Sequence, residues 1–451
     1  MKPKRYFLAL LLAAVPALLL AEERDTVTVY ADRFALAREV RTLTLSRGEQ
    51  EHKLADIPAQ IDPASVTFRA AGPAASIRLL EQRFEFDLAD ADRVLEKSVG
   101  RPIIVGDKQG QAFPGTLLRL AAGDLLLQTE DGALRLVKAD NVATVRFPAL
   151  PEDLITRPTL TWLLDSGKAG SHRIEISYLT GGLGWQTEYA ALASRDEDRL
   201  KLSAWATVEN ASGKSFADVQ VNLVAGEVHR AQPVPLRVQP EDSLRAKAEA
   251  APFPDEEPFS EYHLYRLGRA ATLPDRQARQ LSLFAPVEFD IEKTYRYEGQ
   301  RSKRTVLAGI RFRNDRQHGP GLPLPAGRLR IYREDDQGSQ IFIGEDRIEN
   351  TAMDEQVQVK LGAAFDLTGE RTVKERTQVA RGSRQETIEI RIRSRKARPV
   401  TVLVAEHHWG DWQLIGKPPP VKKKDAQTVE FELAVPPGGE AVLDYLVLIG
   451  D

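Results

Sequence analysis

The stretch 154–230 constrains the fold more than any other part of the chain, because its pattern predicts one strand after another with short polar turns between them. Within 200–209 the even positions are apolar, and all the odd positions except Trp205 are polar. This period of two places one face of a strand on a core. Turn residues follow at 210–213, and alternation resumes at Val219. Two strands joined in this way, beside several others, predict a β-sandwich with immunoglobulin-like topology.

At 451 residues the chain is too long for one hydrophobic core. We therefore expect a mainly β protein made of several β-sandwich (immunoglobulin-like) modules, with a small SH3-like barrel in the N-terminal half. The expected parts are a signal peptide (1–21), an N-terminal β region (22–98), a small SH3-like β-barrel insertion (99–148), a β-sandwich (149–230), a Pro-, Ala- and charge-rich linker (231–258), a second β region (259–380) and a C-terminal β-sandwich region (381–451).

The insertion is predicted from a change in strand length and turn spacing at 100–148. About five short strands are separated by turns that contain Gly110, Gly123 and Gly132. Short strands at this spacing are typical of a small barrel. Just before it, 90–97 predicts a short helix that Asp90 would cap.

The first residues predict export. Lys2, Lys4 and Arg5 precede an apolar run that ends at Ala21, which is typical of a secretory signal peptide cleaved near that residue. The alternative is an uncleaved N-terminal anchor. No later segment is apolar enough to span a bilayer, so we expect a periplasmic or cell-envelope protein without a transmembrane span after cleavage.

Composition excludes several functions. The chain has no cysteine, which rules out disulfides, thiolate metal sites, a cysteine nucleophile and a lipid-modified cysteine. The formal net charge is −3, and removing the three basic residues of the leader takes it to −6. Such an acidic chain is not built to bind nucleic acid.

Two polar groups in strand-like surroundings could suggest a metal. One is Glu406 with His407 and His408, but the two histidines are adjacent, so on a strand their side chains point to opposite faces and cannot easily bind one ion. Asp335 and Asp336 lack the spacing of a calcium loop, and we interpret them as the turn of a hairpin between 328–333 and 340–343. A second hairpin is predicted where 428–435 and 440–448 flank a Pro-Pro-Gly-Gly turn.

The remaining motifs also favour structure over catalysis. The glycine-rich run 178–184 is followed by strand-like sequence, so it predicts a tight turn or bulge and no phosphate loop. We expect Trp162, Trp185 and Trp205 to pack in cores or on sheets. No nucleophile elbow or Ser/His/Asp grouping stands out, so we assign no catalytic, cofactor-binding or metal-binding residue and no cofactor. Paired carboxylates that meet only in space remain an alternative.

One basic segment is a candidate binding surface, because at 387–393 the isoleucines at 388, 390 and 392 alternate with polar residues, which predicts a strand with its isoleucines in a core and its charges on the other face. Its candidate residues are Arg391, Arg393, Arg395, Lys396 and Arg398. Together with the basic run 422–424, they could face an anionic lipid or polysaccharide surface. The alternative is a solvated strand face whose charges discourage edge pairing.

Five blocks in sequence order carry a family resemblance, namely 154–164, 178–189, 205–226, 261–283 and 322–365. The chain resembles the domain of unknown function 4139 family, whose members include mucoidy-inhibitor-like proteins. The resemblance covers nearly all of the chain after residue 21. Some relatives carry a coiled-coil insertion, whereas this sequence has no long heptad run and places its small barrel in the N-terminal half. The resemblance implies no catalytic residues.

These observations predict an exported, non-enzymatic, β-rich envelope protein that binds a protein partner or a surface polymer. One alternative is a hydrolase or carbohydrate-active enzyme with a spatially assembled carboxylate site. Another is a structural module of an envelope assembly.

Overall fold

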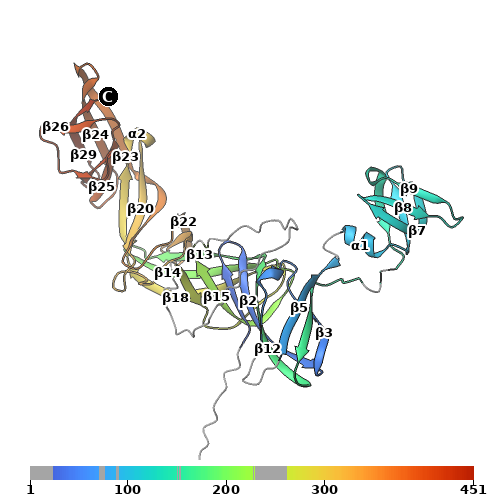
Figure 1. Ribbon diagram of the computed structural model, residues 1–451. Helices are drawn as coiled ribbons and strands as arrows, with labels where there is room; N and C mark the ends of the chain where they lie inside the picture. Colours follow the sequence, from blue (N-terminus) through green and yellow to red (C-terminus); the bar gives the residue numbers. More distant parts are fainter. Residues whose placement is uncertain are drawn as a thin grey trace, which may run out of the picture.

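The computed structural model describes residues 24–70, 77–87, 91–149, 151, 154–226, 228 and 262–450. The predicted signal peptide at 1–21 and the predicted linker at 231–258 lie outside these residues. Strands dominate the described chain, and its two α-helices, α1 (Ala91–Lys97) and α2 (Gly299–Ser302), are short. The prediction of a mainly β protein is therefore confirmed, as is the short helix before the insertion, whereas its predicted cap Asp90 lies outside the described residues. The protein is elongated, with a small sheet at one end and the C-terminal sheet at the other (Figure 1).

Two sheets form the N-terminal half. The larger has seven strands, in the pairing order β16 (His263–Arg266), β15 (Phe216–Ala225), β1 (Thr26–Tyr30), β2 (Phe34–Leu45), β12 (Gly170–Gly181) and β4 (Thr67–Ala70), with β17 (Ala271–Leu273) also pairing with β15. The smaller has the order β3 (Gly48–Ala55), β11 (Thr159–Ser166) and β5 (Ile77–Glu85).

These two sheets combine strands from both sides of the small insertion. β1 runs parallel to β15, and β2 pairs with β12 along its whole length. β11 likewise lies between β3 and β5. Strands from the predicted regions 22–98 and 149–230 therefore share their sheets, and the chain leaves this unit after β5 and re-enters it at β11.

The insertion folds as a separate five-stranded sheet. Its pairing order is β10 (Val142–Arg146), β6 (Pro102–Asp107), β7 (Ala112–Ala121), β8 (Asp124–Gln128) and β9 (Leu134–Val137). The five predicted strands are all present. β9 and β10 end the order without pairing to each other, so the sheet is open and has two edges. Six buried side chains, among them Leu117 and Leu127, form its own core.

A five-stranded sheet lies in the middle of the molecule. Its pairing order is β18 (Gln277–Asp290), β14 (Arg199–Asn210), β13 (Leu183–Ala193), β21 (Gly327–Glu334) and β22 (Gln340–Ile348). The hairpin predicted around Asp335 is confirmed, because β21 and β22 pair antiparallel. β14 and β15 follow each other in the chain yet lie in different sheets, which face each other across one core.

The C-terminal sheet has nine strands. Their pairing order is β26 (Trp412–Ile415), β29 (Glu440–Gly450), β24 (Ser383–Ser394), β23 (Gln356–Ala380), β20 (Thr305–Arg313), β19 (Glu292–Tyr297), β25 (Val400–His407), β28 (Thr428–Val435) and β27 (Lys422–Lys423). The predicted hairpin of β28 and β29 is wrong. The two strands lie near opposite ends of the order, and the sheet curls so that both contribute to one core. The Pro-Pro-Gly-Gly turn therefore connects facing parts of the sheet, because burying both apolar faces requires the chain to cross over.

β20 and β23 join the middle sheet to the C-terminal sheet. At the ends of these strands nearest the middle sheet, Phe312 and Val357 pack into its core. Farther along, Val306 and Leu367 pack into the C-terminal core. Figure 1 shows both strands running from the centre of the molecule to the C-terminal sheet.

Candidate functional site

The five predicted surface-binding residues lie on and just beyond β24. The inward side chains Ile388, Ile390 and Ile392 are fully buried, as the alternation predicts. Arg391 and Arg393 point outward toward the neighbouring strand β29, where Glu440 binds both of them at 2.7 and 3.2 Å. The charge that the sequence placed on this face is therefore largely paired within the sheet.

The other three residues follow the end of β24. The ammonium group of Lys396 lies 5.4 Å from the Tyr295 ring centroid and 3.9 Å from Asp366. Arg398 lies 3.7 Å from Asp196 in the turn between β13 and β14. Arg395 is exposed, and its backbone N–H donates to the Asp366 carbonyl. The five cations are thus spread from the face of β24 to the junction with the middle sheet and do not form one compact patch.

The two adjacent histidines are separated as predicted. His407 ends β25 and lies near Glu298 and Thr428, whereas His408 is buried beside Tyr445 and Trp412. Burial, together with the nearby Arg371 charge, lowers the pKa of His408 to about 4. His408 is therefore neutral at physiological pH. No group of three or more possible metal ligands is found among the described residues.

Glu406, next to His407, lies in a buried cluster that the sequence did not predict. Glu406 is fully buried, and Arg371 Nε donates to both its oxygens at 3.1 and 2.9 Å. The Tyr445 hydroxyl also donates to Glu406, while His408 lies 3.4 Å from that hydroxyl. Burial raises the pKa of Glu406, and its partners offset only part of this rise.

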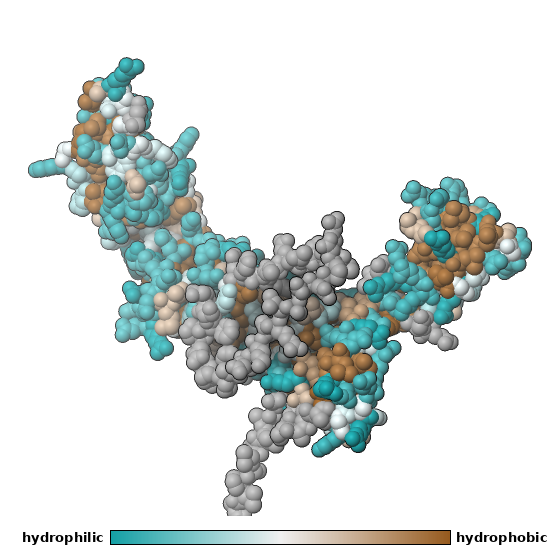
Figure 2. Space-filling model, viewed as in Figure 1, coloured by the Kyte–Doolittle hydropathy of each residue, from teal (hydrophilic) through white to brown (hydrophobic). Residues whose placement is uncertain are grey.

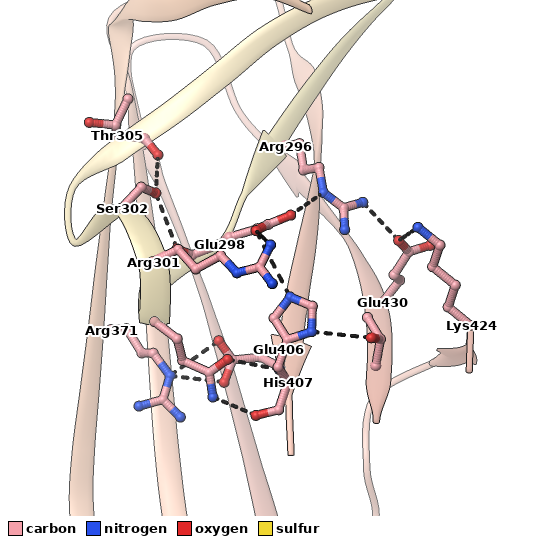
Figure 3. A network of polar contacts seen from close by, with 12 residues as sticks. Arg296, Glu298, Arg301, Ser302, Thr305, Arg371, Glu406, His407, Lys424 and Glu430 are labelled. Atoms are coloured by element: carbon pink, nitrogen blue, oxygen red, sulfur yellow. Dashed lines mark hydrogen bonds and ion pairs between the residues drawn. The ribbon is translucent and has the colours of Figure 1, made fainter. Parts of the chain in front are cut away.

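A second polar layer surrounds this cluster (Figure 3). Arg296 bridges Glu298 and Glu430, with both hydrogen bonds at 2.7 Å. Lys424 adds a contact to Glu430 at 3.8 Å. The carboxylates of this layer already have cationic partners, which compete with any incoming cation. We interpret the network as a structural one that fixes the end of β25.

The short helix α2 completes the arrangement. Gln300 on α2 accepts from the backbone N–H of His407 at 2.8 Å and donates to its carbonyl at 2.7 Å. Ser302 donates to the carbonyls of Glu298 and Thr305 (Figure 3). Since α2 satisfies an edge of β25 that no strand covers there, it orients His407 and the loop after it.

A comparable buried carboxylate lies in the N-terminal half. Glu39 on β2 accepts from Lys214 Nζ at 2.7 Å and is also paired with Arg41 and Tyr178. Lys214 donates in addition to the carbonyl of Asp56 at 2.6 Å. Burial alone would raise the pKa of Glu39, but the charges of Lys214 and Arg41 outweigh it and lower the pKa.

Both clusters leave the same signal in the sequence. Glu39 is in phase with the buried Ala35 and Ala37, and Glu406 is in phase with Val402 and Val404. A carboxylate at an inward position of a strand must find partners, because an unpaired buried charge is very costly. The pattern therefore predicts a buried ion pair, although it cannot name the partner.

A hollow of the C-terminal sheet lies beside the β23–β24 turn and the strand β26. It has a volume of about 680 Å³. It is lined by Arg381, Gly382, Ser383, Asp411, Trp412, Gln413, Leu448 and Gly450. Gly450 has no side chain to fill the space, and the lining offers one cation, one carboxylate and several hydrogen-bonding groups. The hollow can therefore hold a polar ligand that approaches from solvent.

The glycine-rich run and the tryptophans are placed largely as predicted. The run forms the turn between β12 and β13, where Gly182 has a φ of +80° and a Cβ would lie 2.8 Å from the Ala211 backbone. Trp162 and Trp185 are buried. The prediction for Trp205 holds only in part, because this residue lies on the solvent face of β14 and is 41% exposed.

The fold and these sites define a class of multi-sheet β protein with buried ion pairs and surface hollows. A family model described as domain of unknown function (DUF4139) matches residues 174–449. The chain belongs to this family. A search of curated proteins gives no match. Within the described part of the chain, no helix combines the length and the apolar character needed to cross a membrane.

Proposed function

We propose that the protein is an exported, non-enzymatic envelope protein that binds a protein partner or surface polymer through its C-terminal β region. The hollow beside Gly450 carries this proposal, because it joins a cation, a carboxylate and neutral polar groups at solvent-facing strand ends. Rigid β modules commonly present such ends and edges to partners. The proposal includes cleavage near Ala21 and a periplasmic or envelope location.

The lining of the hollow favours binding over hydrolysis. Asp411 is the one carboxylate among its lining residues, whereas glycosidases use two carboxyl groups across the scissile bond. Glu406 is buried and accepts hydrogen bonds from Arg371 and Tyr445, so it is not available to a substrate. A hydrolase with its site elsewhere is the second candidate, and turnover of a glycan or peptide by the purified protein would establish it.

The proposal also assigns a fold type to two parts of the molecule. We propose immunoglobulin-like topology for the sandwich formed by the seven-stranded and middle sheets, because successive strands such as β14 and β15 cross between facing layers. We propose an SH3-like, partly open barrel for the insertion. Its five short strands and glycine turns support this assignment.

A filled-hollow variant tests the binding proposal. Gly450→Phe places a ring in the hollow without backbone strain, since a Cβ there meets Asp411 at an ordinary 3.4 Å. Gly268→Phe is a matched control, because a Cβ at that position has no neighbour within 4 Å. Each form is immobilised and exposed to envelope extract under mild cross-linking and, separately, to the polysaccharide fraction. We expect one stoichiometric ligand that Gly450→Phe loses and Gly268→Phe keeps.

Equal capture by all three forms would contradict the assignment of binding to the hollow. Export is tested independently by intact-mass measurement of the cell-envelope form. A mass that begins after Ala21 supports cleavage. A full-length chain in the membrane fraction would instead establish the anchor.

A further inference from the structure

Three cationic side chains lie where the middle sheet meets the C-terminal sheet. Lys293 on β19 and Lys396 after β24 belong to the C-terminal sheet, whereas Arg333 is on β21 of the middle sheet. We call these three residues the junction cluster. Their side chains are 30%, 25% and 42% exposed, so an ion can reach them from solvent. In the view of Figure 2 the surface around this junction is largely hydrophilic, whereas the small sheet shows a broad apolar surface.

Lys293 occupies an inward position of its strand. It is in phase with the buried Tyr295 and Tyr297 on β19, so its side chain points to the inner face of the sheet. A charge at such a position needs a partner of opposite sign, as it does for the inward glutamates of β2 and β25. The partners of the junction cluster therefore decide what this part of the molecule can bind.

One carboxylate contacts two members of the junction cluster. Glu197, in the turn between β13 and β14, contacts the ammonium group of Lys293 and lies 3.4 Å from Arg333 Nη1. The ammonium group of Lys396 lies 3.9 Å from Asp366, which is too long for a hydrogen bond. Asp366 is about half exposed, so water weakens its attraction for Lys396. Three cations thus face a single carboxylate in close contact.

Two donor groups of the junction cluster are left without an acceptor. Arg333 Nε is buried and has no hydrogen-bond partner among the described residues. Buried donors of this kind are nearly always paired, either within the protein or with a bound water or ion. The ammonium group of Lys396 lies over the Tyr295 ring, at 5.4 Å from its centroid, and makes no hydrogen bond to the described part of the chain. An acceptor from solvent is therefore needed to complete both groups.

The three cations also act on one another. Burial, followed by the charges of Lys396 and Arg333, lowers the pKa of Lys293 to about 8. Lys293 therefore lies within reach of both neighbouring charges. Like charges this close repel one another, and an anion between them removes the repulsion.

We propose that the junction cluster binds a phosphate group, as the free ion or as a monoester. Arginine offers phosphate a planar set of N–H donors, and lysine offers it a compact charge. At neutral pH a phosphate monoester carries about 1.5–2 negative charges, which matches the two positive charges that Glu197 leaves uncompensated. This site lies beyond the opposite end of β24 from the hollow beside Gly450.

A bound phosphate would connect two parts of the molecule. Arg333 holds it from the middle sheet, whereas Lys293 and Lys396 hold it from the C-terminal sheet. The ion therefore adds a polar link to the junction, beside the apolar contacts that β20 and β23 make with the core of the middle sheet.

Isothermal titration of the purified chain with inorganic phosphate tests the proposal, with chloride at matched ionic strength as the reference. We expect saturable binding of one phosphate per chain. Lys396→Gln should weaken it at least roughly tenfold, because a charge-assisted hydrogen bond is lost. Arg333→Lys should also weaken it, since this change keeps the charge but removes the buried Nε. Circular dichroism checks that each variant is folded.

Arg398→Gln is the matched control. It removes one positive charge from the same junction, but the Arg398 side chain is exposed and lies 3.7 Å from Asp196. Phosphate affinity should therefore change by no more than about twofold, as for an exposed ion pair. Gly450→Phe, which fills the hollow, should bind phosphate as the unaltered chain does, so the two sites are tested separately.

Lys293 provides a second readout. Phosphate should raise the pKa of Lys293 from about 8, because a bound anion favours the charged form. NMR titration of the Lys293 side chain with and without phosphate measures the shift, and the loss of the signal in Lys293→Arg assigns it. Chloride at the same ionic strength should leave the pKa of Lys293 unchanged.

Glycerol 3-phosphate separates the two sources of the group. Binding as tight as that of inorganic phosphate supports a monoester carried by a larger ligand, whereas exclusion of the ester supports the free ion. Three results would overturn the proposal: no saturable binding of phosphate, equal weakening by Lys396→Gln and Arg398→Gln, or an unchanged pKa of Lys293 at saturating phosphate.

Discussion

Two buried glutamates, one in each half of the chain, differ in the partners that compensate for the loss of water around their carboxylates. Glu39 is held by Lys214, Arg41 and Tyr178, whereas Glu406 is held by Arg371 and Tyr445. Both carboxylates accept a hydrogen bond from a tyrosine hydroxyl, but Glu39 has two cationic partners and Glu406 has one. The pKa of Glu39 is lowered and that of Glu406 is raised. The number of neighbouring cations therefore decides whether burial or pairing prevails.

The opposite shifts have opposite consequences for stability. Because the pKa of Glu39 is lowered by folding, its contribution is present above its ordinary value of 4.5 and is lost as pH falls through the folded value. The raised pKa of Glu406 gives a contribution that is present below 4.5 and is lost as pH rises through the folded value. The Glu39 cluster therefore stabilises the fold more at neutral pH, whereas the Glu406 carboxyl stabilises it more at acid pH.

The largest effect is expected from Lys214→Met. This change leaves Glu39 buried with Arg41 as its remaining cationic partner, and we expect it to cost about 3–5 kcal/mol. Arg371→Met should cost less, about 2 kcal/mol, because Glu406 more readily takes up a proton. Hydrogen exchange in urea, followed separately in β2 and β25, measures both losses without assuming two-state unfolding.

A double variant provides the control for Lys214→Met. Adding Glu39→Gln removes the uncompensated charge, so the double variant should be more stable than Lys214→Met alone. Simple addition of the two losses would show that Glu39 and Lys214 do not interact as described. Equal losses for Lys214→Met and Arg371→Met would break the comparison itself.

The next effect is a pH dependence of the C-terminal core. Folding lowers the pKa of His408 from 6.5 to about 4, so stability is present above pH 6.5 and is lost as pH falls to about 4. The loss amounts to roughly 3 kcal/mol at most, and Glu406 opposes it at the acid end. Protection of amides in β29 should fall over this window. His408→Phe should flatten the profile, and an unchanged profile in that variant would assign the titration to another group.

A smaller effect separates the two glutamates directly. Glu39→Gln removes a carboxylate that two cations stabilise, and we expect a loss of about 2–3 kcal/mol. Glu406→Gln resembles the protonated form that burial already favours, and we expect about 1 kcal/mol. The free energy of unfolding, measured at pH 7, should fall more for Glu39→Gln than for Glu406→Gln. The reverse order would contradict the assigned directions of the pKa shifts.

The smallest effect belongs to the exposed pairs at Glu440. Reversing Arg391 and Arg393 to Glu places like charges beside Glu440, so we expect a slight loss of stability that salt screens. Thermal melting at low and high salt measures it, and Glu440→Lys on that background should restore the melting temperature. The same double reversal tests the predicted basic surface, since unchanged ligand binding would remove Arg391 and Arg393 from consideration.

Local features were predictable from the sequence because they depend on neighbours in the chain. The alternation at 387–393 identifies which isoleucines are buried, and the glycines at 110, 123 and 132 mark the turns of the small sheet. The position of Glu406, in phase with Val402 and Val404 on β25, is also a local signal and predicts a buried carboxylate. The site residues on β24 were correctly expected to point outward.

Long-range pairing could not be predicted in the same way. Tyr178 and Lys214 reach Glu39 across 139 and 175 positions, and no local pattern encodes these contacts. The same limit explains the incorrect β28–β29 hairpin. Its turn sequence is compatible with a hairpin, but the cost of exposing two apolar faces decides that the strands enter different parts of a curled sheet. Glu440, which pairs with both Arg391 and Arg393, also lies far away in sequence.

β23 has a mechanical consequence. Val357 and Val359, near the start of its 25 residues, pack into the core of the middle sheet, whereas Leu367 packs into the C-terminal core, so a pull on the C-terminal sheet away from the rest of the molecule acts along this strand. The strand partners of β23, β20 and β24, both belong to the C-terminal sheet. We therefore expect tension between the two ends of the protein to pull Val357 and Val359 out of the middle core before it breaks the backbone hydrogen bonds of the C-terminal sheet.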